Sequence, residues 1–351
     1  MKRYLQNIRK VVPYVPGEQP NFPDMIKLNT NENPYPPSPK IQAALQGIAD
    51  SQRLYPDPTS HTLNAAIAQV YQVEESQVFT GVGSDDVLAM IFQTFFNDTL
   101  PIRFPDITYA FYPVWCRLFQ IPYETKPLND NFEIVPSDYF SENGGIVFPN
   151  PNAPTGIALP MNSIEEILQH NPDSLVVIDE AYIDFGGTSA LPLLQKYENL
   201  LIVQTFSKSR SLAGSRIGFC LGAPKLIRAL HDVKYSFNSY TINQASLAIG
   251  TASMLDTDYL EKTTRKIIAT RERTKQQLAS LGFTFPNSKS NFLFVTHTVW
   301  NAKRLYNALR ENHIYVRWFN IPRIQNYLRI TIGTDEQMDT LFRFLENYSE
   351  T

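Results

Sequence analysis

Several features that mark other classes of protein are scarce or absent in this sequence. Its 351 residues include two cysteines, Cys116 and Cys220, which form no CxxC pair. Lysine and arginine number 31 against 34 aspartate and glutamate, so the net charge is only -3. No apolar run approaches the ~18 residues of a membrane span, and the first residues lack the apolar core of a secretory leader. These absences argue against a disulfide-bonded protein, a membrane protein and a nucleic-acid-binding protein. We expect a globular cytoplasmic protein.

The sequence motifs of several common enzyme classes are also missing. The histidines are His61, His170, His231, His297 and His313. Their spacing to each other and to the cysteines is not that of metal ligands. No GxSxG string supports a serine hydrolase. Neither a GxGxxG nor a GxxxxGK[ST] loop occurs, which argues against a nicotinamide dehydrogenase and a P-loop enzyme. We expect no bound metal.

Proline is more frequent than glycine, which is unusual. The chain has 25 prolines and 15 glycines, whereas average usage is roughly 5% Pro and 7% Gly. The prolines crowd the beginning of the chain, where they disfavour a regular helix or a central strand. We therefore expect residues 1–39 to form an extended arm that lies over another part of the molecule.

After the arm, the apolar pattern predicts alternating strands and helices. Runs such as GIVF, LVVI, LLIV and RIGFCLGA show no polar alternation, which is typical of strands buried on both faces of a parallel sheet. Helical segments such as MNSIEEILQH separate them, as in an α/β fold. Residues 40–255 are therefore predicted to form a large α/β domain with a mostly parallel central sheet between helices.

A long helix predicted over about 256–281 precedes a change of pattern. The strings NFLFV, NAKRLYNALRENH, IYVRWF, NYLRITIG and TDEQMDTLFRFLENY predict strand, helix, strand, strand and helix. Thr334 and Gln337 have the spacing of a capping box at the start of the last helix. We expect residues 256–351, with a contribution from the arm, to form a smaller α+β domain.

The strongest chemical signal is TFSKSRSLAGSRIGF, which begins at Thr205. Lys208 follows a strand that we expect to be buried, and it lies among hydroxyl side chains. A partly desolvated lysine amine in such a place suits Schiff-base chemistry with a carbonyl. Ser207, Thr205 and Arg216 have hydrogen-bond donors that suit a phosphate. The alternative interpretation is an ordinary surface lysine.

Carboxylates, glycines and aromatic residues mark further strand ends. Asp179 and Glu180 close the apolar run of SLVVIDEAY, at the sheet edge where α/β proteins bind ligands. In GVGSDD, Ser84 and Asp85 begin a helix whose N-terminus suits a phosphate, or one of them simply caps it. The string PDITYAFYPVWC offers aromatic rings for stacking or for the core. NPNAPTG is a turn-rich loop after another strand.

These motifs, together and in this order, resemble those of the fold-type-I pyridoxal-phosphate enzymes. The order is glycine turn, aromatic stretch, NPxxPTG, Asp-x-x-Tyr, Ser-Lys with an arginine eight positions on, and a C-terminal RxxxG. The strings KLNTNENPY, RLYPDP, VVIDEAYIDF and KYSFNSYTINQAS are similar to the histidinol-phosphate aminotransferase family. The resemblance runs from about Tyr14 to Gly333.

The resemblance implies pyridoxal 5'-phosphate as the cofactor. Lys208 is then the residue that links to it and later moves the substrate proton, Asp179 pairs with its ring nitrogen, and Tyr182 bonds its phenolic oxygen. The resemblance also implies that Tyr109 stacks on the cofactor ring. The residues that it assigns to the cofactor phosphate are Ser84, Asp85, Thr205, Ser207 and Arg216. Tyr55 would reach that phosphate from the second subunit of a symmetric homodimer.

The resemblance also implies the substrates. L-Histidinol phosphate and 2-oxoglutarate would be converted to imidazole acetol phosphate and L-glutamate, with Arg317, Arg329 and Tyr14 as the substrate-binding residues. Guanidinium groups suit both the phosphate and the carboxylates. One position departs from the family pattern, because Ala153 stands where an asparagine usually contacts the phenolic oxygen. Either Asn152 takes over that contact or Tyr182 makes it alone.

Other functions remain open at this point. An aromatic amino-acid aminotransferase or an amino-acid-phosphate decarboxylase would use the same fold and cofactor. A non-catalytic binding protein on this fold would be expected to lack the lysine or the acid. Lys208, Asp179 and Arg216 are all present, which favours an enzyme.

Overall fold

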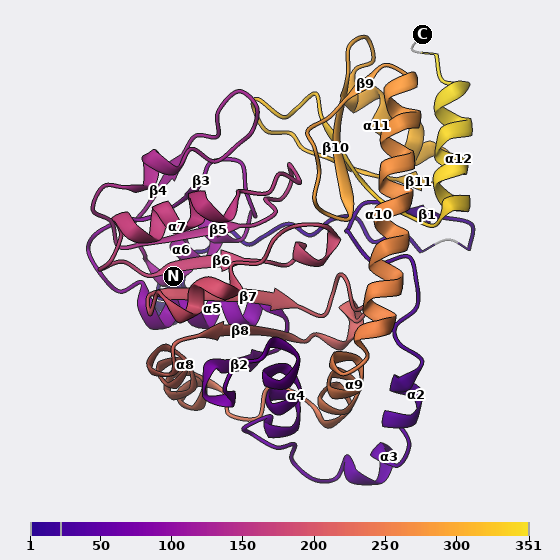
Figure 1. Ribbon diagram of the computed structural model, residues 1–351. Helices are drawn as coiled ribbons and strands as arrows, with labels where there is room; N and C mark the ends of the chain where they lie inside the picture. Colours follow the sequence, from indigo (N-terminus) through magenta and orange to yellow (C-terminus); the bar gives the residue numbers. More distant parts are fainter. Residues whose placement is uncertain (1, 22, 350–351) are drawn as a thin grey trace.

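The computed structural model describes residues 2–21 and 23–349, which form a large sheet, a smaller sheet and one further pair of strands, with covering helices (Figure 1). Within these residues no helix is both long and apolar enough to cross a membrane. The long helix α10 (Thr257–Ser280) runs from the larger sheet to the smaller one (Figure 1). Its bounds agree closely with the helix predicted from the sequence.

The larger sheet has seven strands. Their spatial order is β2 (Val78–Gly81), β8 (Gly218–Gly222), β7 (Leu200–Thr205), β6 (Val176–Asp179), β5 (Gly145–Pro149), β3 (Ile102–Pro105) and β4 (Tyr123–Lys126). Neighbouring strands from β7 to β4 are parallel, while β8 is antiparallel to both β7 and β2. The mostly parallel sheet predicted from the sequence is thus confirmed.

The prediction of a parallel strand for RIGFCLGA was wrong. This segment is β8, and it returns directly beside β7 after a turn that contains Lys208. Apolar residues without alternation indicate burial on both faces but not strand direction. A parallel neighbour would need a crossover of a dozen residues or more, usually through a helix, and here only the short η5 (Ala213–Ser215) lies between the strands.

Helices cover both faces of the large sheet because its strands are apolar on both sides. In β7, Leu201 and Val203 pack with α5 (Ser84–Phe95), α6 (Tyr112–Phe119) and α8 (Pro224–Phe237). Leu200 and Ile202 face the opposite side, where α7 (Met161–His170) and η4 (Leu191–Gln195) lie. Near β2 and β8 that side is covered by α4 (His61–Tyr71) and α9 (Gln244–Met254). Three further single turns are η1 (Glu75–Gln77), η2 (Pro136–Tyr139) and η3 (Ile183–Phe185).

The smaller sheet has four strands, in the order β12 (Arg317–Trp318), β13 (Leu328–Thr331), β10 (Phe292–His297) and β9 (Phe283–Thr284). It packs with α10, α11 (Ala302–Glu311) and α12 (Asp335–Glu346) around one apolar core. The predicted capping box of Thr334 and Gln337 begins α12. IYVRWF forms two short strands, β11 (Ile314–Tyr315) and β12, which belong to different sheets.

The arm is not wholly extended, contrary to the prediction. It contains the short helix α1 (Arg3–Gln6) and the strand β1 (Ile26–Lys27), which pairs in parallel with β11. Two short helices, α2 (Lys40–Ala44) and α3 (Ile48–Ser51), follow it. Beyond β1 the chain stays beside β13, where the Thr331 N–H donates to the Leu28 carbonyl over 2.9 Å. This contact brings the next residues of the arm to the edge of the large sheet.

Candidate active site

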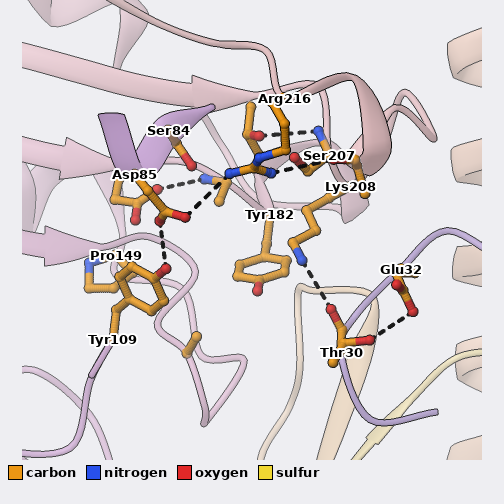
Figure 2. Close-up of a pocket in the computed structure, with 15 residues that line it drawn as sticks. Thr30, Glu32, Ser84, Asp85, Tyr109, Pro149, Tyr182, Ser207, Lys208 and Arg216 are labelled. Carbon is orange, nitrogen blue, oxygen red and sulfur yellow. Dashed lines mark hydrogen bonds and ion pairs between the residues drawn. The ribbon is translucent and has the colours of Figure 1, made fainter. Parts of the chain in front are cut away.

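A cavity lies at the carboxyl ends of three adjacent parallel strands (Figure 2). Pro149, Asp179 and Thr205 end β5, β6 and β7 and line it. This edge is where open α/β sheets bind ligands. The other residues of the lining come from the arm, the start of α5, the segments after β3, β5 and β6, and the β7–β8 turn. They are Thr30, Glu32, Ser84, Asp85, Tyr109, Ala153, Ala181, Tyr182, Ser207, Lys208, Ala213 and Arg216.

Lys208 is half-buried in the turn after β7, and its amine points into this cavity (Figure 2). Its Nζ donates a hydrogen bond to the Thr30 carbonyl over 3.1 Å and lies 5.8 Å from the centre of the Tyr182 ring. The arm thus holds the amine in place. Because the lysine faces a cavity and not bulk solvent, its position suits a reactive amine.

Asp179 is the last residue of β6, and only 5% of its surface is exposed. Its carboxylate accepts hydrogen bonds from the Ala181 N–H over 3.1 Å and from the Tyr112 hydroxyl over 3.4 Å. Burial, with repulsion from Asp85 as a smaller contribution, raises the pKa of this carboxyl to about 7. No cation pairs with it within the described residues, so the protonated ring nitrogen of pyridoxal phosphate fits this side of the cavity.

The buried Asp179 carboxyl makes the stability of the cofactor-free protein depend on pH. Its pKa rises from 3.8 to about 7 on folding, so between these values the folded state binds more protons than the unfolded state. The free energy of unfolding therefore falls as pH rises through this window, by up to about 4 kcal/mol. Burial also raises the pKa of Glu180 to about 7, which adds a contribution of the same sign.

We expect the variant Asp179→Asn to lose the Asp179 part of this pH dependence. Urea denaturation of the cofactor-free protein between about pH 4.5 and 7.5 measures it, because an amide does not titrate in that range. Glu180→Gln is the matched variant for the other carboxyl. A pH slope that Asp179→Asn leaves unchanged would mean that the carboxyl is not desolvated as the structure indicates.

A group of donors at the start of α5 suits a phosphate. Ser84 begins this helix, and Ser207 and Arg216 approach it from the β7–β8 turn (Figure 2). The helix N-terminus, two hydroxyls and a guanidinium are the groups that bind phosphate in proteins. Gly83 precedes the helix with φ of 86°, and a Cβ there would lie 2.6 Å from the Arg216 Nη2. Only glycine therefore lets the guanidinium come so close.

Asp85 contacts both Arg216 of this group of donors and the aromatic residue Tyr109. Its carboxylate accepts a hydrogen bond from the Tyr109 hydroxyl over 2.6 Å and lies 3.4 Å from the Arg216 Nη2. Burial, followed by the nearby Asp85 charge, raises the pKa of Tyr109 far above its ordinary value. Tyr109 therefore stays neutral, with its ring at the edge of the cavity.

The predicted substrate residues line an adjoining cavity. Tyr14, Arg317 and Arg329 border it, together with Lys208 and Tyr182, which also line the first cavity. Arg317 and Arg329 lie directly opposite each other on β12 and β13. Like charges placed opposite each other repel, so this pair favours an anion. The Arg329 Nη2 donates to the Asn29 carbonyl over 3.1 Å, while its buried Nε has no partner within the described residues.

Tyr14 brings an aromatic ring from the arm. It stacks on Phe111 with ring centres 4.3 Å apart, and Phe111 stacks in turn on Trp115. The arm thereby covers one side of the adjoining cavity. Burial, then repulsion from Arg317, lowers the pKa of Arg329, which remains a cation at neutral pH.

Two predicted cofactor residues do not line the Lys208 cavity. The Asn152 amide donates to the Ile107 carbonyl over 3.0 Å and to the Thr155 hydroxyl, and its oxygen accepts from Thr108. Asn152 therefore stabilises the NPNAPTG loop by contacts outside the Lys208 cavity, while Ala153 of the same loop lines the cavity. Tyr55 is 81% exposed and packs against Tyr240 on the surface.

The sequence analysis predicted an arm over the site but missed the contacts that residues 29–33 of the arm make there. The Asn31 side chain donates to the Tyr182 hydroxyl over 2.9 Å, and the Asn33 side chain donates to the Lys208 and Ser209 carbonyls. The available signal was the string NTNEN, in which three asparagines and one threonine stand inside a proline-rich arm. It served only to support a resemblance, because the arm's partner across the fold is not visible in a linear sequence.

Comparison with known proteins places the chain in a family. A family model described as aminotransferase class I and II matches residues 23–345. The histidinol-phosphate aminotransferase of Lactococcus lactis subsp. cremoris is 52% identical over 97% of this chain and 96% of the relative. That of Acinetobacter baylyi is 52% identical over 99% of this chain and 97% of the relative.

Solved structures share the fold. A histidinol-phosphate aminotransferase from Sinorhizobium meliloti, in complex with pyridoxal-5'-phosphate, has a TM-score of 0.83 at 24% identity over 92% of this chain and 89% of its own. A putative histidinol-phosphate aminotransferase from Erwinia carotovora atroseptica has a TM-score of 0.85 at 24% identity, over 92% and 95%. Fold and family match together define a class I and II aminotransferase of fold type I. Within that class, the chain belongs to the histidinol-phosphate aminotransferase family.

Proposed function

We propose that this protein uses pyridoxal 5'-phosphate to transfer the amino group of L-histidinol phosphate to 2-oxoglutarate. The products are imidazole acetol phosphate and L-glutamate, and the reaction belongs to histidine biosynthesis. The observation that carries the proposal is a pair of cavities that share Lys208. The first is also lined by the buried Asp179, and the second by the opposed pair of Arg317 and Arg329.

The cofactor, when bound, supplies an electron sink for the electrons released at the substrate's α-carbon. The Asp179 carboxylate holds a proton on its ring nitrogen, which keeps that sink effective. Tyr182 donates a hydrogen bond to its phenolic oxygen. The Lys208 Nζ would be the amine that links to the cofactor and would take the proton from the substrate's α-carbon.

The remaining side chains bind and orient. Ser84, Asp85, Thr205, Ser207 and Arg216 surround the cofactor phosphate, with Asp85 acting through its backbone and through Arg216. Tyr109 covers the ring. Arg317 and Arg329 bind the phosphate of one substrate and the carboxylates of the other, and Tyr14 closes over them. Asn152 supports the loop that carries Ala153 and does not contact the cofactor, which leaves Tyr182 to bond the phenolic oxygen.

The proposal includes a homodimer with shared sites. Tyr55 is 81% exposed and Phe237 72% exposed, and Tyr55 packs on Tyr240, so an aromatic surface is available to a second copy. From there Tyr55 would reach the partner's cofactor phosphate. Sedimentation tests this point, since a particle of 40.1 kDa, the mass of one chain, would contradict it. We also propose that residues 1–39, 40–255 and 256–351 act as arm, cofactor domain and small domain.

We propose a cytoplasmic location for the enzyme. The free, buried cysteines Cys116 and Cys220 suit a reducing compartment. Fractionation of cells that express the tagged chain tests the location, and recovery of the protein outside the cytoplasm would contradict it.

The absorbance spectrum of the purified protein tests the function. We expect a visible band from the lysine-linked cofactor, which disappears when L-histidinol phosphate is added and returns with 2-oxoglutarate. If phenylalanine or tyrosine removed the band and histidinol phosphate did not, the enzyme would be an aromatic aminotransferase. Release of carbon dioxide from an amino-acid phosphate would indicate a decarboxylase. Absence of a band after incubation with pyridoxal phosphate would contradict the assignment of Lys208.

A further inference from the structure

Three consecutive residues of the arm contact three different side chains of the site. The Asn29 carbonyl accepts from Arg329, the Thr30 carbonyl accepts from Lys208, and the Asn31 side chain reaches Tyr182. The first two contacts use only the backbone, and any residue would provide them. The contact to Tyr182 depends on the identity of Asn31, which points to a specific role for this amide.

Asn31 is held rigidly on all sides. It is 1% exposed, and its backbone has φ of 57°, a left-handed conformation that asparagine and glycine tolerate better than most residues. Its N–H donates to the Thr331 hydroxyl over 3.0 Å, and its carbonyl accepts from the Asn291 side chain over 3.0 Å. The arm residue is therefore anchored to β13 and to the segment before β10.

The hydrogen-bond network determines which end of the Asn31 amide faces Tyr182. The Thr331 hydroxyl has one proton, and it donates that proton to the Asn31 Oδ1 over 3.1 Å. With the oxygen engaged there, the Nδ2 faces the Tyr182 hydroxyl at 2.9 Å and donates to it. The reversed amide would leave the Thr331 proton without an acceptor in the network, so we assign the amide with its oxygen toward Thr331.

Because the Tyr182 hydroxyl oxygen accepts a hydrogen bond from Asn31, the hydroxyl can donate its own proton to another partner. Tyr182 lines both cavities beside Lys208, and its ring is fixed by edge contact with Phe292. The amide can only donate at this point, so it cannot accept the phenol proton. That proton is consequently available to an acceptor in the cavity.

We infer that Asn31 is a positioning residue, which directs the Tyr182 hydroxyl proton toward the phenolic oxygen of the bound cofactor. This inference rests on the proposed function. Ala153, which lines the same cavity, has no side-chain donor of its own. Tyr182 is then the donor to the phenolic oxygen, and its orientation is set by the arm.

The test is a spectrophotometric pH titration of the visible band in the holoenzyme without substrate. A hydrogen bond donated to the phenolic oxygen withdraws the negative charge that helps to hold a proton on the Lys208 nitrogen. If Asn31→Gly weakens that bond, the nitrogen holds its proton more firmly. We expect the midpoint of the band to move upward by about 1 pH unit, the size of one such interaction. Glycine keeps the backbone conformation of residue 31.

A double-variant comparison separates this role from a structural one. If Asn31 acts through Tyr182, Asn31→Gly should add no further shift to Tyr182→Phe, because the hydroxyl is already gone. Thr331→Val, which lets the amide rotate without changing Asn31, should move the midpoint in the same direction. Asn29→Ala is the control, since the Asn29 side chain donates to the Glu18 carbonyl and does not reach Tyr182.

Either of two results would overturn the inference: an Asn31→Gly midpoint equal to that of the wild type, or a shift that persists in full with Tyr182→Phe. A purely structural role would lower the unfolding temperature and leave the midpoint in place. Failure of the proposed function is distinguishable, because the wild-type protein itself would then show no visible band.

Discussion

The Lys208→Ala variant is expected to lose turnover by on the order of 10⁴-fold, the upper range for a lost proton-transfer group. The Lys208 amine points into the cavity that Asp179 also lines (Figure 2), and Lys208 borders the adjoining cavity of Arg317 and Arg329 as well. An alanine neither links to the cofactor nor takes a proton. The variant should also lack the visible band of the lysine-linked cofactor, although the phosphate-binding side chains remain to hold the cofactor noncovalently.

Borohydride reduction makes this prediction specific to one residue. Reduction of the wild-type holoenzyme should attach the cofactor permanently to the peptide that contains Lys208, as read by mass spectrometry. Lys196→Ala is the matched control, because that lysine forms an exposed ion pair with Glu165 away from the site. Labelling of a different lysine, or retained turnover in Lys208→Ala, would refute the assignment.

The Asp179→Asn variant is expected to reduce turnover by about 10²–10³-fold, as when one preorganised electrostatic contact is removed from an active site. The buried Asp179 carboxylate has no cationic partner within the described residues, so the protonated ring nitrogen of the cofactor would balance its charge. An amide of the same size fills the same space but carries no negative charge. The cofactor should therefore bind, while its ring nitrogen loses its proton near neutral pH.

The neighbouring acid offers a matched control for Asp179. Glu180 is equally buried, yet it accepts from the Ser189 hydroxyl, the Ala190 N–H and the Gln204 side chain and does not line the cavity. Glu180→Gln should lower the free energy of unfolding by about 1–3 kcal/mol because one buried donor loses its acceptor. Its turnover should stay within a few-fold of the wild type. Equal losses of turnover in the two variants would show that Asp179 acts only through the fold.

Local sequence predicted the elements that carry these two residues. A run of β-branched residues followed by an acid or by a serine–lysine pair indicates a buried strand and its carboxyl end. Since parallel strands end at one edge of a sheet, Asp179 and Lys208 were expected to lie together, and the structure places them in one cavity. The direction of β8 was predicted wrongly, because burial on both faces is the same for either direction.

The parts that sequence reasoning missed are contacts between segments far apart in the chain. Asn31 and Tyr182 are 151 residues apart, and Asn31 and Thr331 are 300 residues apart. No periodicity records such pairs. Asn152 is a further case: its place in the loop string left a cofactor contact open, and in the structure its amide donates to the Ile107 carbonyl and the Thr155 hydroxyl.

The sequence by itself determined the strand ends, the placement of Lys208 and Asp179 at two of them, and the class of enzyme to which the chain belongs. These features depend on neighbouring residues, whose burial pattern and turn composition act locally. Only the tertiary structure decided which side of the NPNAPTG loop faces the cavity, and how the arm reaches Lys208, Tyr182 and Arg329. The loop is held by the hydrogen bonds of Asn152 to Ile107 and Thr155. The arm is held by the pairing of β1 with β11 and by the hydrogen bonds between Asn31 and Thr331, which are far apart in the chain.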